Sequence, residues 1–181
     1  MMKIETWEMK TLDWTEKGDH GIVLSPAVVA DLIYSTDTER VDIAFFDVSE
    51  AVGANKWIYP CALPVVKTIL AALPGCRGAA RSKCLELLGG IAGSESAPEA
   101  PGIHQDCLFE IRQASWYFIY GLQFDDVELA CLYVDILGVL GDKFDDFRAT
   151  AQKYLELSLT RSLPEYDRVM VRNTIDDLGR Q

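Results

Sequence analysis

The sequence has no apolar run long enough to cross a membrane as a helix. Such a helix needs about 20 mostly apolar residues, and charged residues interrupt the hydrophobic stretches of this chain before that length. Glu5 and Glu8 fall where the apolar core of a secretory signal would be. We therefore expect a cytoplasmic protein that does not bind membranes.

Histidine is scarce, and the cysteines form no recognisable set. The two histidines, His20 and His104, are far apart and belong to no metal or catalytic motif. The five cysteines are odd in number and include no CxxC pair, which argues against a disulfide framework and against a zinc site. We expect no metal, no cofactor and no enzyme activity.

Basic residues are too few to balance the acidic ones. Seventeen bases stand against 28 acids, which gives a net charge of −11. This sign opposes the phosphate backbone that dominates nucleic-acid affinity, so we expect no nucleic-acid ligand. An acidic surface can instead steer a basic protein partner, although an excess of acid also keeps a protein soluble without any partner.

The sequence does contain helical periodicity along nearly its whole length. Ser25 and Pro26 are typical of a helix start, and Gly53 of a helix end. No alternation long enough for a sheet follows residue 25, and residues 1–24 could form a strand, a helix or a cap. We predict an all-α protein, a single domain over residues 1–181 with residues 1–24 as an N-terminal cap. The predicted helices cover about residues 26–34, 38–53, 60–73, 77–92, 104–122, 125–140, 144–158 and 164–178.

The segment 127–140 is apolar on almost its whole circumference. Its only charged residues are Glu128 and Asp135, which are seven positions apart and therefore lie on the same side of a helix. A helix of this kind must be covered on several sides, either in a globular bundle or in a stacked solenoid.

Two features favour the solenoid. The predicted helices follow one another in pairs across short turns, 38–53 with 60–73 and 104–122 with 125–140. In addition, a Leu-Leu-Gly-Gly-Ile helix end has a similar counterpart about 49 residues later, a spacing close to that of a HEAT-type repeat.

The residues from Trp57 to Val66, Trp-Ile-Tyr-Pro-Cys-Ala-Leu-Pro-Val-Val, are followed by Leu70 and by an arginine-containing segment over 77–88. Together with the segment 127–140, they resemble bacterial HEAT-like helical-repeat proteins, in which an aromatic-Pro turn opens a Leu-rich helix. The resemblance covers about residues 38–160. It implies a right-handed α-α superhelix of HEAT-like antiparallel helix pairs, with about eight helices.

The resemblance also implies a function. HEAT-like proteins are binding scaffolds, and several are immunity proteins that neutralise a toxin from polymorphic-toxin or contact-dependent growth inhibition systems. Many of these toxins are basic nucleases, to which an acidic inhibitor is complementary. We therefore expect a stoichiometric inhibitor without catalytic residues. The side chains expected to contact its partner are carboxylates and aromatics: Glu128, Asp135, Asp42, Glu50, Trp116, Tyr117 and Tyr120.

Other interpretations stay open. A general interaction adaptor would have the same fold, and each of these carboxylates could also be an ordinary solvated group. A metal-dependent enzyme could use paired acids, since hard cations prefer oxygen ligands, although aspartates near helix ends also have a capping role. The pairs are Asp125-Asp126, Asp145-Asp146 and Asp176-Asp177. A helical-repeat DNA glycosylase would need a cationic stripe, which the sequence lacks. The sequence does not determine the oligomeric state.

Overall fold

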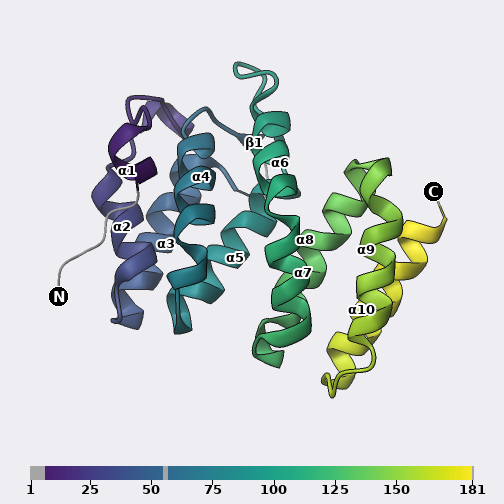
Figure 1. The fold of residues 1–181 in the computed structure, drawn as a ribbon. Coiled ribbons are helices and arrows are strands. Elements are labelled where there is room, and N and C mark those ends of the chain that lie inside the picture. The colour runs from purple at the N-terminus through teal and green to yellow at the C-terminus, as the bar shows by residue number, and fades with distance from the viewer. Residues whose placement is uncertain (1–6, 55–56, 181) are drawn as a thin grey trace. The chain divides into compact units, whose positions relative to one another are not determined.

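The computed structural model describes residues 7–54 and 57–180, and within them the fold class is all-α, as predicted (Figure 1). These residues form ten α-helices, two more than expected. One is the short α1 (Trp7–Thr11), and the other arises because the predicted helix over 104–122 is divided in two. Ile4 and Thr6, part of the ambiguous N-terminal segment, lie outside the described residues.

The chain divides into two compact units, Met1–Ile111 and Arg112–Gln181. This division concerns packing, and the single repeat domain over residues 1–181 stays a prediction.

The first unit contains α1 and four longer helices, and α6 begins in it. The longer helices and α6 are α2 (Pro26–Tyr34), α3 (Thr38–Val52), α4 (Ala62–Ala72), α5 (Gly78–Ala92) and α6 (Ile103–Gln113). Two strands of two residues each, β1 (Trp57–Ile58) and β2 (Glu95–Ser96), pair in parallel. The sequence predicted no sheet, because a ladder of two residues is too short to produce an alternating pattern.

The start of α2 at Ser25 and the end of α3 at Gly53 confirm the capping predicted from the sequence, and the structure adds a cap at the start of α3. The Ser25 hydroxyl accepts a hydrogen bond from the Ala27 amide at 3.3 Å. The Asp37 carboxylate accepts from the amides of Glu39, at 3.0 Å, and Arg40, at 3.4 Å. Gly53 ends α3 in the left-handed conformation, with φ of 71°. These caps fix where α3 starts and stops, and therefore which of its side chains face outward.

The buried stripe of α3 is formed by Val41, Ala44, Val48 and Val52, at the predicted helical spacing. This stripe packs mainly against α2 and α5 (Figure 1). The sequence predicted that the helix over 38–53 pairs with the helix over 60–73. This prediction is wrong, because the main contacts of α3 are with α2 and α5 and not with α4. The connection between the two helices contains β1, which pairs with β2 instead of turning α4 directly back onto α3.

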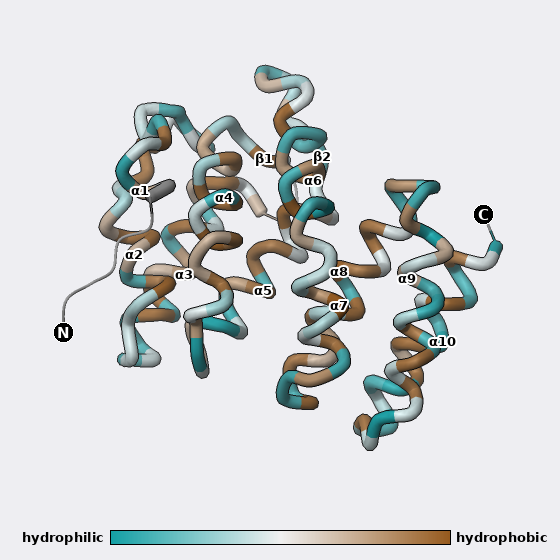
Figure 2. The backbone as a smooth tube through the Cα atoms, in the orientation of Figure 1, coloured by the Kyte–Doolittle hydropathy of each residue, from teal (hydrophilic) through white to brown (hydrophobic). Residues whose placement is uncertain are grey.

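The second unit is built around α8 (Ala130–Lys143). This helix packs against α7 (Ser115–Phe124), α9 (Asp145–Ser158) and α10 (Glu165–Gly179). Figure 2 colours most of α8 as hydrophobic, and its side chains Tyr133, Val134, Ile136, Leu137 and Leu140 are fully buried. The prediction that the segment 127–140 must be covered on several sides is confirmed. The predicted contact between the segments 104–122 and 125–140 is also confirmed, and it is made by α7 and α8.

Two helix boundaries differ from the prediction. Ala114, with φ of −88° and ψ of 7°, separates α6 from α7, and an arginine of α6, Arg112, donates to the Ser115 hydroxyl at 3.2 Å. Residues Val127–Leu129 form a 3-10 turn before α8. The apolar periodicity of the sequence continues through both places. It therefore does not reveal where the backbone leaves the α-helical conformation for one or a few residues.

Candidate protein-binding surfaces

Each pair of acids considered as metal ligands has at least one member with a structural partner, which for Asp177 is Arg180 at 3.2 Å. Asp145 pairs with Arg148 at 2.8 Å, and Asp146 pairs with Arg112 at 3.3 Å. Asp125 accepts a hydrogen bond from the Tyr133 hydroxyl at 2.6 Å. Within residues 7–54 and 57–180, no group of three or more histidine, cysteine, aspartate or glutamate side chains is arranged to hold a metal ion. In the same residues, no helix has the length and apolar character that a membrane crossing requires.

Two of the buried cysteines are poor nucleophiles. Burial raises the pKa of Cys61 and that of Cys107 to about 12 each. Since the thiolate is the reactive form, both thiols stay protonated and unreactive at neutral pH. They pack as small hydrophobic side chains.

An open hollow of about 690 Å³ lies in the first unit beside residues 15–21. Its lining includes Glu16, Asp19, Glu99 and Tyr59. The hydrogen bond that Tyr59 makes to Asp19, together with partial desolvation, raises the pKa of Tyr59 above its ordinary value.

The outward side of α3 combines carboxylates with exposed hydrophobic side chains. Ile43 is 58% exposed and Phe46 is 64% exposed. We call this surface the α3 acidic face. It consists of Glu39, Asp42, Ile43, Phe46, Asp47 and Glu50, all of them exposed.

The spacing along α3 places the two hydrophobic residues at the centre of this face. Glu39 comes four residues before Ile43, and Glu50 comes four residues after Phe46, so each carboxylate lies on the same side as its hydrophobic neighbour. Asp42 and Asp47 flank the pair along the two edges. An apolar centre with a polar rim is the usual anatomy of a protein–protein interface.

The negative charge of the α3 acidic face is not neutralised by its neighbours. Among the described residues, none of its four carboxylates forms an ion pair. Arg40, the only base in α3, pairs with Asp31 of α2 at 2.7 Å. The Lys83 ammonium lies 4.4 Å from the centre of the Phe45 ring and pairs with Glu86. The face is therefore suited to a cationic surface.

Sequence reasoning found Asp42 and Glu50 on this face but missed Ile43 and Phe46. A usable signal was present, because both residues lie off the stripe that α3 buries and so are hydrophobic on an otherwise acidic side. An apolar side chain left on the polar side of an amphipathic helix is a candidate contact for a partner.

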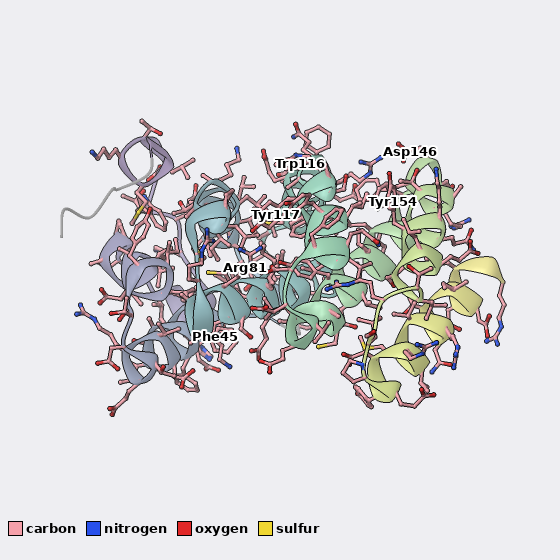
Figure 3. All side chains as sticks on the ribbon, turned by 60° about the horizontal axis from the view of Figure 1, so that its bottom comes forward. Phe45, Arg81, Trp116, Tyr117, Asp146 and Tyr154 are labelled. Atoms are coloured by element: carbon pink, nitrogen blue, oxygen red, sulfur yellow. The ribbon has the colours of Figure 1, made fainter. Side chains whose placement is uncertain are left out.

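The other expected contact residues lie in the second unit and have different environments. Trp116 is 65% exposed and Tyr120 is 60% exposed, so both can meet a partner. Figure 3 labels Trp116 and its neighbour Tyr117 on α7. Tyr117 is only 9% exposed and packs edge-on against Phe118, with ring centroids 6.1 Å apart. We therefore do not retain Tyr117 as a contact residue.

Glu128 and Asp135 do not belong to one continuous α-helix. Glu128 lies in the 3-10 turn over Val127–Leu129, whereas Asp135 lies in the middle of α8. Both side chains reach solvent. The single continuous helix expected over both residues is therefore divided into a 3-10 turn and α8, and their role in partner binding stays a prediction.

Partial burial raises the pKa of Asp135 above its ordinary value. A carboxyl group whose pKa is higher in the folded than in the unfolded state favours folding only while it is protonated. The protein loses this contribution to its stability as pH rises through the folded-state pKa. Replacing Asp135 by asparagine should therefore make the protein slightly more stable at pH 7, by up to about 0.5 kcal/mol, the usual range for exposed positions. This gain in stability should vanish at a pH below the pKa that Asp135 has in the unfolded chain.

Thermal unfolding at the two pH values checks this expectation. Asp176→Asn, on α10, removes one negative charge from another exposed position and serves as the control. A variant at Asp135 that is less stable than the wild type at pH 7 would show that the carboxylate is favourable where it lies.

The α3 acidic face of the first unit and the exposed aromatics of α7 in the second are thus the two surfaces best suited to binding. Comparison with known proteins adds no relative to this picture, since no family model, no curated protein and no solved structure matches the chain.

Proposed function

We propose that this chain is a protein-binding HEAT-like scaffold, a cytoplasmic immunity protein that neutralises a cognate bacterial toxin by one-to-one binding. The observation that supports this function most strongly is the α3 acidic face. It presents Ile43 and Phe46 to solvent between four carboxylates that have no ion-pair partner among the described residues. A surface of this composition fits a basic protein that also offers apolar contacts.

The proposal includes the finer architecture implied by the resemblance, a right-handed superhelix of antiparallel helix pairs. Sequential helices pack on one another within each unit, α2 on α3 in the first and α7 on α8 in the second. Stacked helical pairs leave outer helix faces free for binding, which is consistent with the exposure of the α3 acidic face.

The net charge of −11 supports a basic partner. A nuclease toxin must attract phosphate groups, so its active site is surrounded by positive charge. An acidic inhibitor can cover that site, and electrostatic attraction would speed the encounter between the two proteins. The α3 acidic face concentrates this charge where two hydrophobic side chains can also be buried.

A scaffold of this kind should inhibit by occupancy. We expect complete inhibition at about one equivalent, and the toxin should be recovered chemically unchanged when the complex is separated. A basic partner can be captured from the native host on the immobilised chain, identified, produced separately and titrated in an activity assay.

The titration distinguishes three outcomes. Complete inhibition at one equivalent, with intact toxin recovered, supports the proposal. Tight binding to a basic protein that has no toxic activity would replace the immunity function with that of an adaptor. Inactivation by a small fraction of an equivalent would show turnover, and occupancy would then be wrong.

A further inference from the structure

Helix α7 carries no charge, although the chain as a whole is strongly acidic. Its sequence, Ser-Trp-Tyr-Phe-Ile-Tyr-Gly-Leu-Gln-Phe, contains no charged residue, whereas every other α-helix in the described part of the chain contains at least one. Three of its aromatic side chains are exposed: Trp116 by 65%, Tyr120 by 60% and Phe124 by 73%. We call these three residues the α7 aromatic face.

The buried side of α7 is fixed, so the aromatic face cannot turn inward. Phe118 and Leu122 are fully buried. A side chain at Gly121 would overlap the Tyr133 ring of α8, which shows how closely the two helices approach. Arg161 donates to the carbonyl oxygens of Leu122 and Asp125 and so holds the C-terminal end of α7. The rotation of the helix is therefore determined by its packing, and the aromatic face stays in solvent.

The aromatic face has a symmetric spacing. Trp116 and Phe124 are each four residues from Tyr120, in opposite directions, so the three rings follow one side of the helix. The rings of Tyr120 and Phe124 already touch, with centroids 4.9 Å apart at an angle of 42°. A twofold axis through Tyr120 would bring Trp116 opposite Phe124 of an identical helix, and Tyr120 opposite its own copy.

We propose that a second copy of this chain occupies the α7 aromatic face, with the two α7 helices antiparallel across a twofold axis at Tyr120. Charge favours this occupant. Two chains of net charge −11 repel each other, and a helix without charged residues offers a contact where that repulsion is least. A basic partner would gain no ion pair from α7 itself, whereas the α3 acidic face would supply several.

The size of the surface sets the strength of the dimer. An aromatic side chain buries about 150–250 Å², so the exposed fractions of these three give roughly 400 Å² per copy and roughly 800 Å² in total. This area lies below the about 1,200–2,000 Å² of stable complexes. The dimer should therefore be weak and concentration-dependent, with a dissociation constant in the micromolar range or above.

Sedimentation equilibrium of the full chain, over about 1 μM to 1 mM, tests the proposal. The wild-type protein should shift from monomer to dimer, and more readily at high salt, because screening reduces the repulsion between the copies. Tyr120→Glu places two like charges together at the axis and should leave a monomer. Tyr166→Glu, at an exposed tyrosine of α10, adds the same charge elsewhere and should still dimerise. Thermal unfolding of both variants confirms that they fold.

Cross-linking tests the symmetry separately. Tyr120→Cys faces its own copy across the axis and should form a covalent dimer under mild oxidation, whereas Trp116→Cys should form far less. The wild-type chain controls for cross-linking through Cys131, its one cysteine that is not fully buried.

The proposal is independent of the proposed function. A protein that stays monomeric at every concentration, or a dimer that Tyr120→Glu leaves intact, would overturn it. A third result would also overturn it: the wild type is monomeric, and Tyr120→Glu abolishes binding of a basic partner. The α7 aromatic face would then be the contact surface for that partner. The salt effects are opposite in sign, since salt should strengthen this dimer and weaken capture by the α3 acidic face.

Discussion

Replacing Gly53 by alanine should lower the free energy of unfolding by about 2–4 kcal/mol, at the upper end for a change of one methyl group. Gly53 has φ of 71°, a conformation that side chains with a Cβ atom rarely adopt. A Cβ atom there would also overlap the carbonyl oxygen of Trp57 and lie 3.0 Å from the Tyr59 ring. Because the nearest atom belongs to the backbone, it cannot move away as a flexible side chain would. Urea unfolding measures the loss.

Gly75→Ala is the matched control for this prediction. Gly75 lies in the turn after α4, and a Cβ atom there would meet no atom within 4 Å. The free energy of unfolding of the Gly75→Ala variant should stay within about 1 kcal/mol of the wild-type value. If the free energy of unfolding fell equally in the two variants, the tight turn that ends α3 would not be a special structural requirement.

Reversing charge on the α3 acidic face should have the largest effect on binding. Asp42→Lys combined with Glu50→Lys puts two cations opposite a basic partner, and we expect the affinity to fall by about 100-fold or more, which corresponds to about 2.7 kcal/mol. Both side chains are exposed and form no ion pair within the described residues, so the fold should be unaffected. Isothermal titration with the captured partner measures the change.

A second double variant separates local charge from total charge. Glu156→Lys with Asp176→Lys also changes the net charge from −11 to −7, because each substitution removes one negative charge and adds one positive charge. These residues are exposed on α9 and α10 of the second unit. Equal losses of affinity in the two double variants would mean that only the overall charge matters and that the α3 acidic face is not the contact surface.

The sequence predicted local structure well where one side chain decides it. Ser25 starts a helix because its side-chain oxygen accepts a hydrogen bond from a backbone amide, and Gly53 ends one because it tolerates a positive φ. The burial of α8 was also predictable, since a helix that is apolar all round must be covered. These features depend on neighbours within a few residues.

The sequence predicted the contact between α7 and α8 but not the main contacts of α3. α3 packs on α5 instead of α4, a choice that depends on the path of the connection through β1 and not on the pattern within either helix. The break at Ala114 was missed for a related reason, because apolar residues continue on both sides of it.

The candidate contact residues were predicted only in part. Asp42 and Glu50 were found because an acidic residue on the polar side of a helix wheel faces outward. Trp116 and Tyr117 could not be told apart, because α7 is apolar on every side and has no polar side to orient its wheel. The rotation of α7 depends on its packing against α8, where Gly121 lies against the Tyr133 ring, and it leaves Tyr117 buried and Trp116 exposed.

The most direct test of electrostatic capture by the α3 acidic face is the rate of association with the captured basic partner, measured by stopped flow from about 0.1 M to about 1 M salt. The Debye length falls from about 10 Å to about 3 Å over this range. We expect the wild-type rate to fall steeply with salt, and the rate of Asp42→Lys/Glu50→Lys to be slower and much less dependent on salt. A wild-type rate that does not change with salt and equals that of the variant would contradict the account.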